Sequence, residues 1–510
     1  MSAEAVLAQD VIATNIGNLL FSQSVMRALS VPGADVVPNS YMAGRRGVDD
    51  AYIARINDEF DHFVVPLANA FRPSFQPNLE RLTRVVRGLD MPVTVVGVGS
   101  QHPLEGAGDD PSAEAVKAFM AAVLDRSASV GVRGELTADY LAGLGFGDAH
   151  VEVIGCPSLH MDGPEPAVTR RVEALGPDSA IATSASPDTD VMSPVIRRHA
   201  ERFPHLVYVP QNSWDLNTLV WGEAAQDPTA TSELVSTSSP LHLRDQVRFP
   251  LDPRTWVDFL RGCDFAFGTR LHGTVAAILA GTPAVLLAHD SRTLELADYH
   301  RIPYKRIDEV TEDVRAEDLY EEADFSAFHA QRAENFERFT AFLGKNGLPH
   351  IYEDGAAAPE FDRRLREAEL PPLVHPLLAP GVAGQREVMS RIRWLRQGKR
   401  GDRPRTAHAF TRELPHTEKP PVTVERVDKR LTRTVGSLDR QRDDLSTLKT
   451  EVAELRSRLS DVSEDLRQAR RRADRQAEVL KRLDVLLLTR ARRHRQRLAR
   501  RVVSRISPRR

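Results

Sequence analysis

The chain has 510 residues, of which 27% are charged and 41% apolar, and its formal net charge is −3. This length and composition exclude a wholly disordered chain, a collagen-like repeat and a small disulfide scaffold, and they suggest two or three domains with hydrophobic cores. The two cysteines, Cys156 and Cys263, are too few to staple such a chain and are typical of a reducing compartment.

The hydropathy and charge patterns bear on location. The longest nearly apolar stretch, 276–288, is too short to span a bilayer, and the acidic N-terminus shows no secretory signal, so we expect a cytosolic protein. Residues 481–510 carry a charge of +11, which leaves −14 on the rest of the chain. We therefore expect an acidic folded part with one basic C-terminal segment rather than a specific nucleic-acid binder.

From about residue 5 to residue 343, β-rich runs alternate with amphipathic stretches. The pattern predicts strands at 93–97, 130–132, 151–154, 180–183, 206–209, 265–267 and 284–287, and helices at 113–124, 135–144, 254–262 and 273–280. This alternation is typical of α/β proteins with parallel sheets. We predict two Rossmann-like lobes that face a cleft, at 1–165 and 166–345, divided at the Gly163–Pro166 break.

The remaining residues have a different character. Residues 346–420 are rich in proline and charge, which predicts a linker or irregular region with one helical island near 385–397. A heptad then runs from Val424 to Leu487 with an apolar residue at every a position, which predicts a coiled coil over 421–490. A long solvated single helix is the alternative, and a basic tail follows at 491–510.

The segment Phe267-Gly-Thr-Arg-Leu-His-Gly-Thr274 is the richest in chemistry. It follows a predicted strand and opens a helix, where parallel sheets bind ligands and helix N-termini attract anions. Arg270 supplies a guanidinium suited to carboxylate or phosphate, and His272 can titrate near neutral pH. The structural alternative is that Arg270 pairs with an acid and His272 caps the helix.

One strand–helix unit later, Asp290, Arg292 and Glu295 are expected at the same sheet edge. They could contact substrate, or they could form a helix cap in which Asp290 is the N-cap and Glu295 pairs with Arg292. In the first lobe, the turn Asn15-Ile-Gly-Asn18, the loop Gly97-Val-Gly-Ser-Gln101 and the lone Arg133 are weaker signals, each more often structural than functional. No histidine or cysteine spacing indicates a metal site.

These motifs together resemble the polysaccharide pyruvyl transferase family over roughly residues 10–345. The diagnostic string is Gly268-Thr-Arg-Leu-His-Gly-Thr-Val-Ala-Ala-Ile-Leu-Ala-Gly-Thr-Pro283, followed by Asp290-Ser-Arg292, Glu295 and Ile302-Pro303. The resemblance implies a two-lobed fold similar to glycosyltransferase-B enzymes. It also implies transfer of a pyruvyl group from phosphoenolpyruvate onto two sugar hydroxyls as a ketal, with release of phosphate.

The resemblance also implies the roles of residues. His272 and Arg270 are the expected catalytic residues, with His272 as general acid or base and Arg270 and Arg133 holding the donor's carboxylate and phosphate. The other expected substrate contacts are Leu271, Gly273, Asn15, Gly17, Asn18, Gly97, Gly99, Ser100, Asp290, Arg292 and Glu295. Where the family pattern has an aspartate, this chain has Asn18, Gly134 and Cys156.

Phosphoenolpyruvate as donor, and no further cofactor, is the expected small-molecule requirement. The expected partners are a glycan or lipid-linked glycan acceptor and further copies of this chain through the coiled coil. The basic tail is expected either to attach the protein to an anionic membrane at the inner face or to be solvated or bound to nucleic acid. Two other functions stay open, a nucleotide-sugar glycosyltransferase and a coiled-coil scaffold with a degenerate catalytic lobe.

Overall fold

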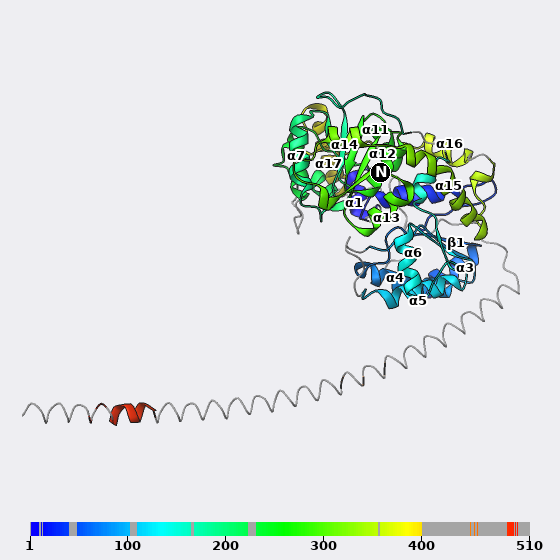
Figure 1. Cartoon of the computed structure of the whole chain (residues 1–510), viewed down its shortest axis with the longest axis horizontal. Coiled ribbons are helices and arrows are strands. Elements are labelled where there is room, and N and C mark those ends of the chain that lie inside the picture. The colour runs from blue at the N-terminus through cyan, green and yellow to red at the C-terminus, as the bar shows by residue number, and fades with distance from the viewer. Residues whose placement is uncertain are drawn as a thin grey trace, which may run out of the picture. The chain divides into compact units, whose positions relative to one another are not determined.

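The computed structural model describes residues 2–9, 12, 14–39, 48–101, 110–164, 168–222, 231–354, 358–399, 449, 453, 456, 487–493, 495 and 497 (Figure 1). The chain separates into two compact units, Met1–Lys419 and Pro420–Arg510. Strands β1–β9 and helices α1–α17 belong to the first unit. None of the described helices combines the length and the apolar character that a membrane span requires.

The first sheet is built from short, valine-rich strands. β1 (Phe63–Pro66) pairs in parallel with β2 (Val93–Val96), and β3 (Val130–Val132) pairs in parallel with β4 (Val151–Val153). A parallel bridge between Val98 and Val132 joins the two pairs. Every residue of β2 and β3 is buried, as β-branched runs are in parallel sheets covered on both faces.

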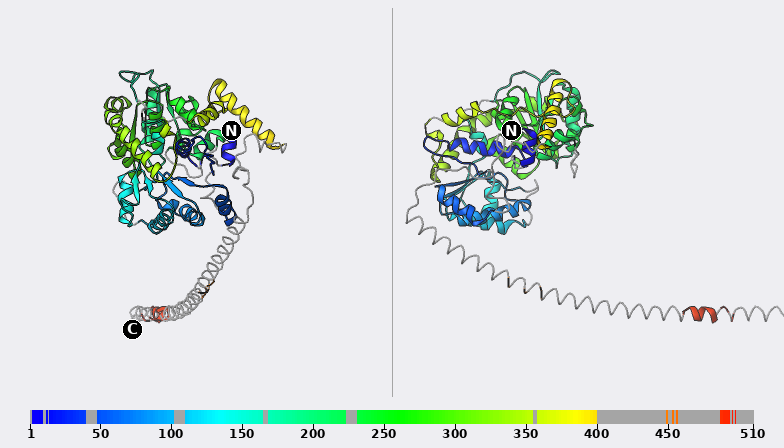
Figure 2. Two further views of the ribbon diagram at one scale, coloured as in Figure 1. Left: turned by 90° about the vertical axis from the view of Figure 1, so that its right-hand side faces the viewer. Right: turned by 180° about the vertical axis from the view of Figure 1, so that it is seen from behind.

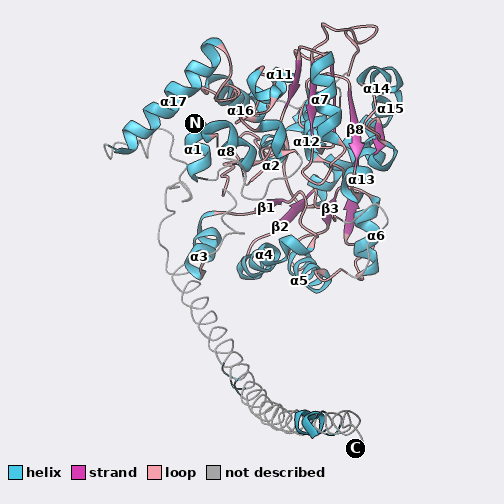
Figure 3. Cartoon of the chain, turned by 90° about the vertical axis from the view of Figure 1, so that its left-hand side faces the viewer, coloured by secondary structure: helices cyan, strands magenta, loops and turns pink. Residues whose placement is uncertain are grey.

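Helices α3 (Asp50–Glu59), α4 (Gln76–Gly88), α5 (Ala113–Leu124) and α6 (Glu135–Gly143) surround this sheet. α4 and α5 lie side by side, and α5 contacts β2 and β3 (Figure 3). The face that α5 buries carries Val116, Phe119, Met120 and Val123, which are three or four positions apart along the helix.

The second sheet has its described strands in the order β6-β5-β7-β8-β9, all parallel. They are β5 (Ile181–Ser184), β6 (Leu206–Tyr208), β7 (Phe265–Gly268), β8 (Ala284–Ala288) and β9 (Tyr304–Arg306). The α/β class with parallel sheets, which the sequence predicted, is therefore confirmed. The helices of this part are α7 (Met192–Arg202), α8 (Ser213–Trp221), α9 (Ser232–Val235), α10 (Pro240–Leu243), α11 (Pro253–Leu260), α12 (Leu271–Leu279), α13 (Ser291–His300) and α14 (Ala316–Glu322).

The hydrophobic cores do not divide the chain at 165/166. α1 (Ala3–Gln9) and α2 (Gly17–Ala28) precede the first sheet in sequence, yet Ile16, Leu20 and Phe21 pack in the core of the second sheet. Further along, Val25 and Leu29 pack with Val96 of β2 and with Ile154. The N-terminal segment therefore contacts both sheets, and the predicted lobe boundary at 165/166 stays a prediction.

A long helix, α15 (Ser326–Lys345), connects the two cores. Phe328 near its start packs with the second sheet, whereas Phe339 and Phe342 near its end pack with Val96 and Ile154 of the first. Figure 2 shows the body from two further sides.

The proline-rich segment is folded as far as residue 399. It forms the 3-10 helix η5 (Ile351–Asp354), α16 (Pro359–Glu367) and α17 (Gly381–Lys399). Val374 pairs with Phe249 through two backbone hydrogen bonds of 2.9 and 3.0 Å, and Arg27 forms a 3.0 Å ion pair with Asp362. α17 contains the predicted helical island near 385–397. These contacts favour the alternative of an irregular region over that of a linker for this part, while 400–420 lies outside the described residues.

Most of the predicted coiled coil and basic tail also lies outside the described residues. Residues 487–493 are helical, and Leu487, the last a position of the heptad, is exposed there. The oligomer that the heptad predicts stays a prediction.

Candidate functional site

The carboxyl ends of strands from both sheets meet. Gln101 lies after β2 and Thr137 after β3, and they contact Asp290 and Glu295, which follow β8. The Gln101 amide donates to Asp290 Oδ2 at 3.1 Å, and the Thr137 N–H donates to Glu295 Oε2 at 2.9 Å. Ligands of open parallel sheets bind at this edge, so the side chains gathered here form the candidate site.

Arg133 is fully buried at the end of β3. Its Nε donates to the Gly97 carbonyl at 3.1 Å, and its guanidinium lies 5.2 Å from the centre of the Phe21 ring. Both terminal nitrogens, Nη1 and Nη2, are buried without a hydrogen-bond partner among the described residues. Burial lowers the pKa of Arg133 to about 10, so it remains a cation at neutral pH. Buried donors are normally satisfied, and a charged one without a partner indicates a place for an anion.

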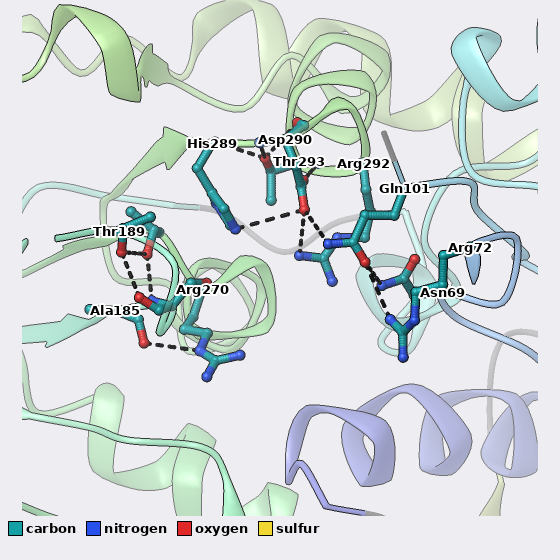
Figure 4. Close-up of polar contacts among 12 residues, drawn as sticks. Asn69, Arg72, Gln101, Ala185, Thr189, Arg270, His289, Asp290, Arg292 and Thr293 are labelled. Carbon is teal, nitrogen blue, oxygen red and sulfur yellow. Dashed lines mark hydrogen bonds and ion pairs between the residues drawn. The ribbon is translucent and has the colours of Figure 1, made fainter. Parts of the chain in front are cut away.

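Arg270 occupies the N-cap position of α12, directly after β7. Its Nε donates to the Ala185 carbonyl at 3.0 Å. Figure 4 shows its guanidinium in the same region as those of Arg292 and Arg72. Burial lowers the pKa of Arg270, while Tyr208 and Asp215 act in the opposite direction. The described part of the chain gives Arg270 no ion pair within 4.0 Å, so the alternative of a pairing with a structural acid is not realised there.

Gly268 makes this placement possible. Its φ is +152°, and a Cβ there would lie 2.0 Å from the Ser184 carbonyl oxygen of the neighbouring strand. Only glycine therefore allows β7 to run beside β5 and then turn into α12.

His272 lies in the first turn of α12 and packs against the start of α2. A Cβ on Gly17 would be 2.5 Å from its Nδ1, and its ring meets that of Phe21 edge to face at 6.2 Å. Nε2 is buried without a partner in the described chain. The pKa of His272 is well below 6.5, first because of burial and then because Arg133, Arg292 and Arg270 repel the charged form.

The alternative that His272 caps α12 is not realised, because His272 lies inside the helix and Arg270 occupies the N-cap position. A neutral imidazole surrounded by arginines is a proton acceptor, so the base role fits the free protein better than the acid role.

The two neighbours of His272 have structural roles. The side chain of Leu271 is buried in the hydrophobic core, and contact of this residue with substrate stays a prediction. A Cβ on Gly273 would lie 2.6 Å from Ser184 Oγ and 3.0 Å from Gln211 Nε2, so glycine lets the helix approach β5 closely.

Asp290 and Arg292 realise the capping alternative in part. Asp290 is the N-cap of α13 and accepts the Thr293 N–H at 2.9 Å. Its Oδ2 also accepts from Arg292 Nη2 at 3.1 Å (Figure 4). Burial would raise the pKa of Asp290, but Arg292 and His289 outweigh it and hold that pKa below its usual value. Arg292 Nε remains buried and unpartnered in the described chain.

Glu295 does not pair with Arg292. Its carboxylate accepts from both the N–H and the hydroxyl of Thr137, at 2.9 and 2.8 Å. Burial raises the pKa of Glu295 to about 7, against the opposing effects of Thr137 and Arg133. A Cβ on Gly134 would lie 3.0 Å from Glu295 Oε2, so this carboxylate fills the space that a side chain at 134 would use.

Asn15 holds the turn before α2 in place. Its amide donates to Asn212 Oδ1 at 3.0 Å, and its Oδ1 accepts the Gly17 N–H at 2.8 Å. Asn18 follows in the first turn of α2, where its N–H donates to the Asn15 carbonyl at 3.1 Å. These contacts give Asn15 a positioning role, and its contact with substrate stays a prediction.

The glycine loop after β2 supports Arg133 in the same way. A Cβ on Gly97, which has φ +75°, would lie 2.8 Å from Phe21, and one on Gly99 would lie 3.0 Å from Arg133 Cδ. The Ser100 N–H donates to Thr137 Oγ1 at 3.0 Å. The loop packs against the side chains that form the site.

Three functional candidates were not singled out from the sequence. The ring of Phe21 contacts both Arg133 and His272. Arg72, after β1, donates to Gln101 Oε1 at 3.3 Å, and its Nε is buried and unpartnered in the described chain. Asp215 in α8 is buried, and burial raises its pKa to about 7 although Arg270 opposes this. Of these three residues, only Arg72 could have been recognised in the sequence, as a cation shortly after a strand.

The described residues contain no group of three or more His, Cys, Asp or Glu side chains placed to hold a metal ion.

A family model described as polysaccharide pyruvyl transferase matches residues 15–291. This range begins at Asn15 and ends one residue after Asp290, and it includes Arg133, Arg270 and His272. Comparison with curated proteins returned no match.

Several solved structures are remotely similar. A putative UDP-N-acetylglucosamine 2-epimerase from Listeria monocytogenes is 13% identical, with 63% of this chain and 80% of that chain covered and a TM-score of 0.32. A UDP-GlcNAc 2-epimerase from Neisseria meningitidis is 11% identical, with 62% and 80% covered and a TM-score of 0.30. An α,α-trehalose-phosphate synthase from Burkholderia vietnamiensis is 13% identical, with 72% and 85% covered and a TM-score of 0.29.

Proposed function

Because the chain belongs to the polysaccharide pyruvyl transferase family, and is thus a transferase, we propose that it ketalises a glycan with phosphoenolpyruvate. In this reaction the methylene carbon of the donor gains a proton, and the adjacent carbon forms bonds to two acceptor oxygens while its bond to the phosphate oxygen breaks. The two acceptor hydroxyls release two protons. One of them accounts for the proton that the methylene carbon gains, and the released phosphate takes the other.

The unpartnered guanidinium of Arg133 carries this proposal. Phosphoenolpyruvate bears about three negative charges near neutral pH. Arg133 offers two buried terminal nitrogens, and Arg270 stands at the N-terminus of α12, whose unpaired N–H groups add a positive end. Two guanidinium groups suit the two anionic groups of the donor, its carboxylate and its phosphate.

His272 is proposed as the base. Its Nε2 is unpartnered and its ring is neutral at neutral pH, so it can take the proton of an attacking hydroxyl. Binding of an anionic donor between the arginines would raise the pKa of His272, because it cancels their repulsion.

The proton for the methylene carbon needs a different donor. Glu295, which Arg133 influences electrostatically, and Asp215, which Arg270 influences, both have a pKa raised to about 7, so each keeps a proton in part of the molecules near neutral pH. Glu295 also supplies a carboxylate beside Gly134, where the family pattern has an aspartate. We therefore assign the acid role to one of these two groups.

Donor discrimination tests the proposal. The full chain is incubated with a panel of cell-surface glycans and lipid-linked precursors, with either phosphoenolpyruvate or nucleotide sugars labelled in the transferred group. Label transferred from phosphoenolpyruvate with equimolar phosphate release is the expected result. Transfer from a nucleotide sugar alone would support a glycosyltransferase, and no transfer together with no phosphoenolpyruvate-induced change in melting temperature would support the scaffold alternative.

A further inference from the structure

α17 has one face fixed to the body. Arg391 donates to the carbonyls of Leu219 and Val220 in α8 and forms a 3.3 Å ion pair with Glu387 one turn earlier. Ser390 donates to Glu4 of α1 at 3.4 Å. Figure 3 shows α17 beside α1 and α8 at the outer edge of the body. The orientation of α17 about its own axis is therefore set by named contacts.

The face beside these contacts carries apolar side chains that are only partly covered by the described residues. The exposed fractions are 38% for Val388, 55% for Met389, 42% for Ile392 and 54% for Leu395. Ile392 is four residues after Val388 and three after Met389, and Leu395 is three after Ile392, so these side chains form one stripe along the helix. Single exposed apolar residues are ordinary, but a continuous stripe on one helix face indicates a binding surface.

The exposed charges on α17 are all basic. Arg386, Arg393 and Arg396 are exposed beside the stripe, whereas the acid of the helix, Glu387, is half-buried and held by Arg391. An apolar stripe bordered by arginines is typical of helices that lie in the interface of an anionic membrane. A second copy of α17 packed on the same face would bring arginines against arginines, which is unfavourable.

We propose that this face of α17 binds the surface of an anionic lipid bilayer, with the helix axis parallel to the surface. The stripe enters the boundary between headgroups and acyl chains, and the arginines pair with anionic headgroups. The inference does not depend on the transferase proposal, because its tests measure binding and not turnover.

Cosedimentation of the full chain with vesicles is the first test. Wild type should bind vesicles that contain phosphatidylglycerol and not vesicles of phosphatidylcholine alone. Because each basic residue contributes about one factor of five near such a surface, Arg393→Glu with Arg396→Glu should lower the partition coefficient at least about 10²-fold at low salt. Arg84→Glu with Arg87→Glu on α4 changes the charge equally and should leave the partition coefficient near that of wild type.

The stripe is tested separately. Met389→Asp with Ile392→Asp should abolish binding, and Tyr304→Asp, at an exposed aromatic residue of β9, should not. Far-ultraviolet circular dichroism and melting temperature establish that each variant is folded. Unchanged binding of the folded α17 variants, or failure of wild type to bind anionic vesicles, would overturn the proposal.

A label on the stripe excludes attachment by another part of the chain. Both native cysteines are buried, so Ile392→Cys can be labelled selectively with an environment-sensitive dye, with Tyr304→Cys as the matched control. Anionic vesicles should shift the emission to the blue at 392 and leave it unchanged at 304. Sedimentation without a blue shift at 392 would assign binding to the tail and overturn the proposal. A shift that grows with protein concentration without lipid would assign the face to a second copy, with the same consequence.

Discussion

Arg133 and His272 share one neighbour, the ring of Phe21. The guanidinium of Arg133 lies 5.2 Å from the ring centre, and the imidazole of His272 meets the ring edge to face at 6.2 Å. Phe21 comes from α2, whereas Arg133 follows β3 and His272 lies in α12, so three distant parts of the sequence meet at one ring. This contact fixes the proposed anion-binding cation relative to the proposed base.

The protonation of His272 is a direct consequence of this arrangement. We predict that its imidazole stays neutral in the free protein well below pH 6.5, as carbon-13 or nitrogen-15 chemical shifts of labelled histidine would report. The unfolded chain binds this proton more tightly than the folded one, so His272 lowers stability progressively as the pH falls below about 6.5. A His272 pKa at or above 6.5 without ligand would contradict the described environment.

His272→Ala should abolish transfer and leave the fold intact, because the proposed base is lost while the core around Leu271 and Val275 is kept. Initial rates together with melting temperature measure the two effects. Turnover near the wild-type value in the folded variant would contradict the base assignment.

Arg270→Lys should bind the donor more weakly than wild type, although it keeps the positive charge. A lysine ammonium cannot make the two parallel hydrogen bonds of a guanidinium, so the affinity for phosphoenolpyruvate should fall on the order of 10- to 100-fold. Calorimetric titration of the variant measures this, and an affinity equal to wild type would contradict the role assigned to the guanidinium.

Among the elements, β7 and α12 lie so close to β5 that a side chain in place of their glycines would block the packing. Gly268→Ala places a methyl group 2.0 Å from the Ser184 carbonyl at a φ that alanine avoids, so we predict a loss of about 2–4 kcal/mol in unfolding free energy. Gly143→Ala in α6 has open space around it and should be neutral or stabilise the protein by less than about 1 kcal/mol. Denaturant unfolding of both variants checks the contrast, which equal losses would contradict.

α13 contacts α6 through Glu295, whose pKa is raised to about 7. The unfolded chain releases this proton near pH 4.5 and the folded protein near 7, so Glu295 lowers stability as the pH rises through that interval. Glu295→Gln keeps an acceptor for Thr137 and should flatten this part of the stability profile. Unfolding free energies at pH 5 and pH 8 measure the change, and an unaltered profile would contradict the assignment.

The sequence predicted the buried helices and strands well. It predicted poorly the exposed elements and those held in place by contacts with distant parts of the chain. The predicted segments at 93–97, 113–124, 130–132 and 284–287 are close to the observed elements because valine runs and helical periodicity survive in any context. β9 has one exposed and two half-buried residues, Tyr304, Lys305 and Arg306, so its composition does not resemble a core strand. For residues 346–420 the prolines and charges predict a linker or irregular region with one helical island, because the pairing of Val374 with Phe249 leaves no signal in the sequence.

The same distinction holds for the site. The Arg270–His272 motif was predicted because the sequence pattern indicates the end of a strand followed by the start of a helix. Phe21 and Asp215 were not, because their role comes from burial beside residues far away in the chain.

For the molecule as a whole, the first unit contains both sheets, and the heptad belongs to the second. We predict that residues 421–490 join copies of the chain, since an apolar stripe of that length is unfavourable in water. Light scattering should give a multimeric mass for the full chain and a monomeric mass for Leu438→Asp with Leu459→Asp. A monomer in the unsubstituted chain at micromolar concentration would contradict the heptad interpretation.

The central claim is that the buried guanidinium of Arg133 holds the anionic donor. Its most direct test is calorimetric titration of phosphoenolpyruvate into wild type and into Arg133→Met, which keeps much of the apolar volume and removes the charge. Loss of a charged buried contact predicts a dissociation constant at least about 10²-fold larger in the variant. The dissociation constant of Arg84→Met, on the surface of α4, should differ little from that of wild type. Equal affinity in wild type and Arg133→Met, or no binding to wild type, would contradict the claim.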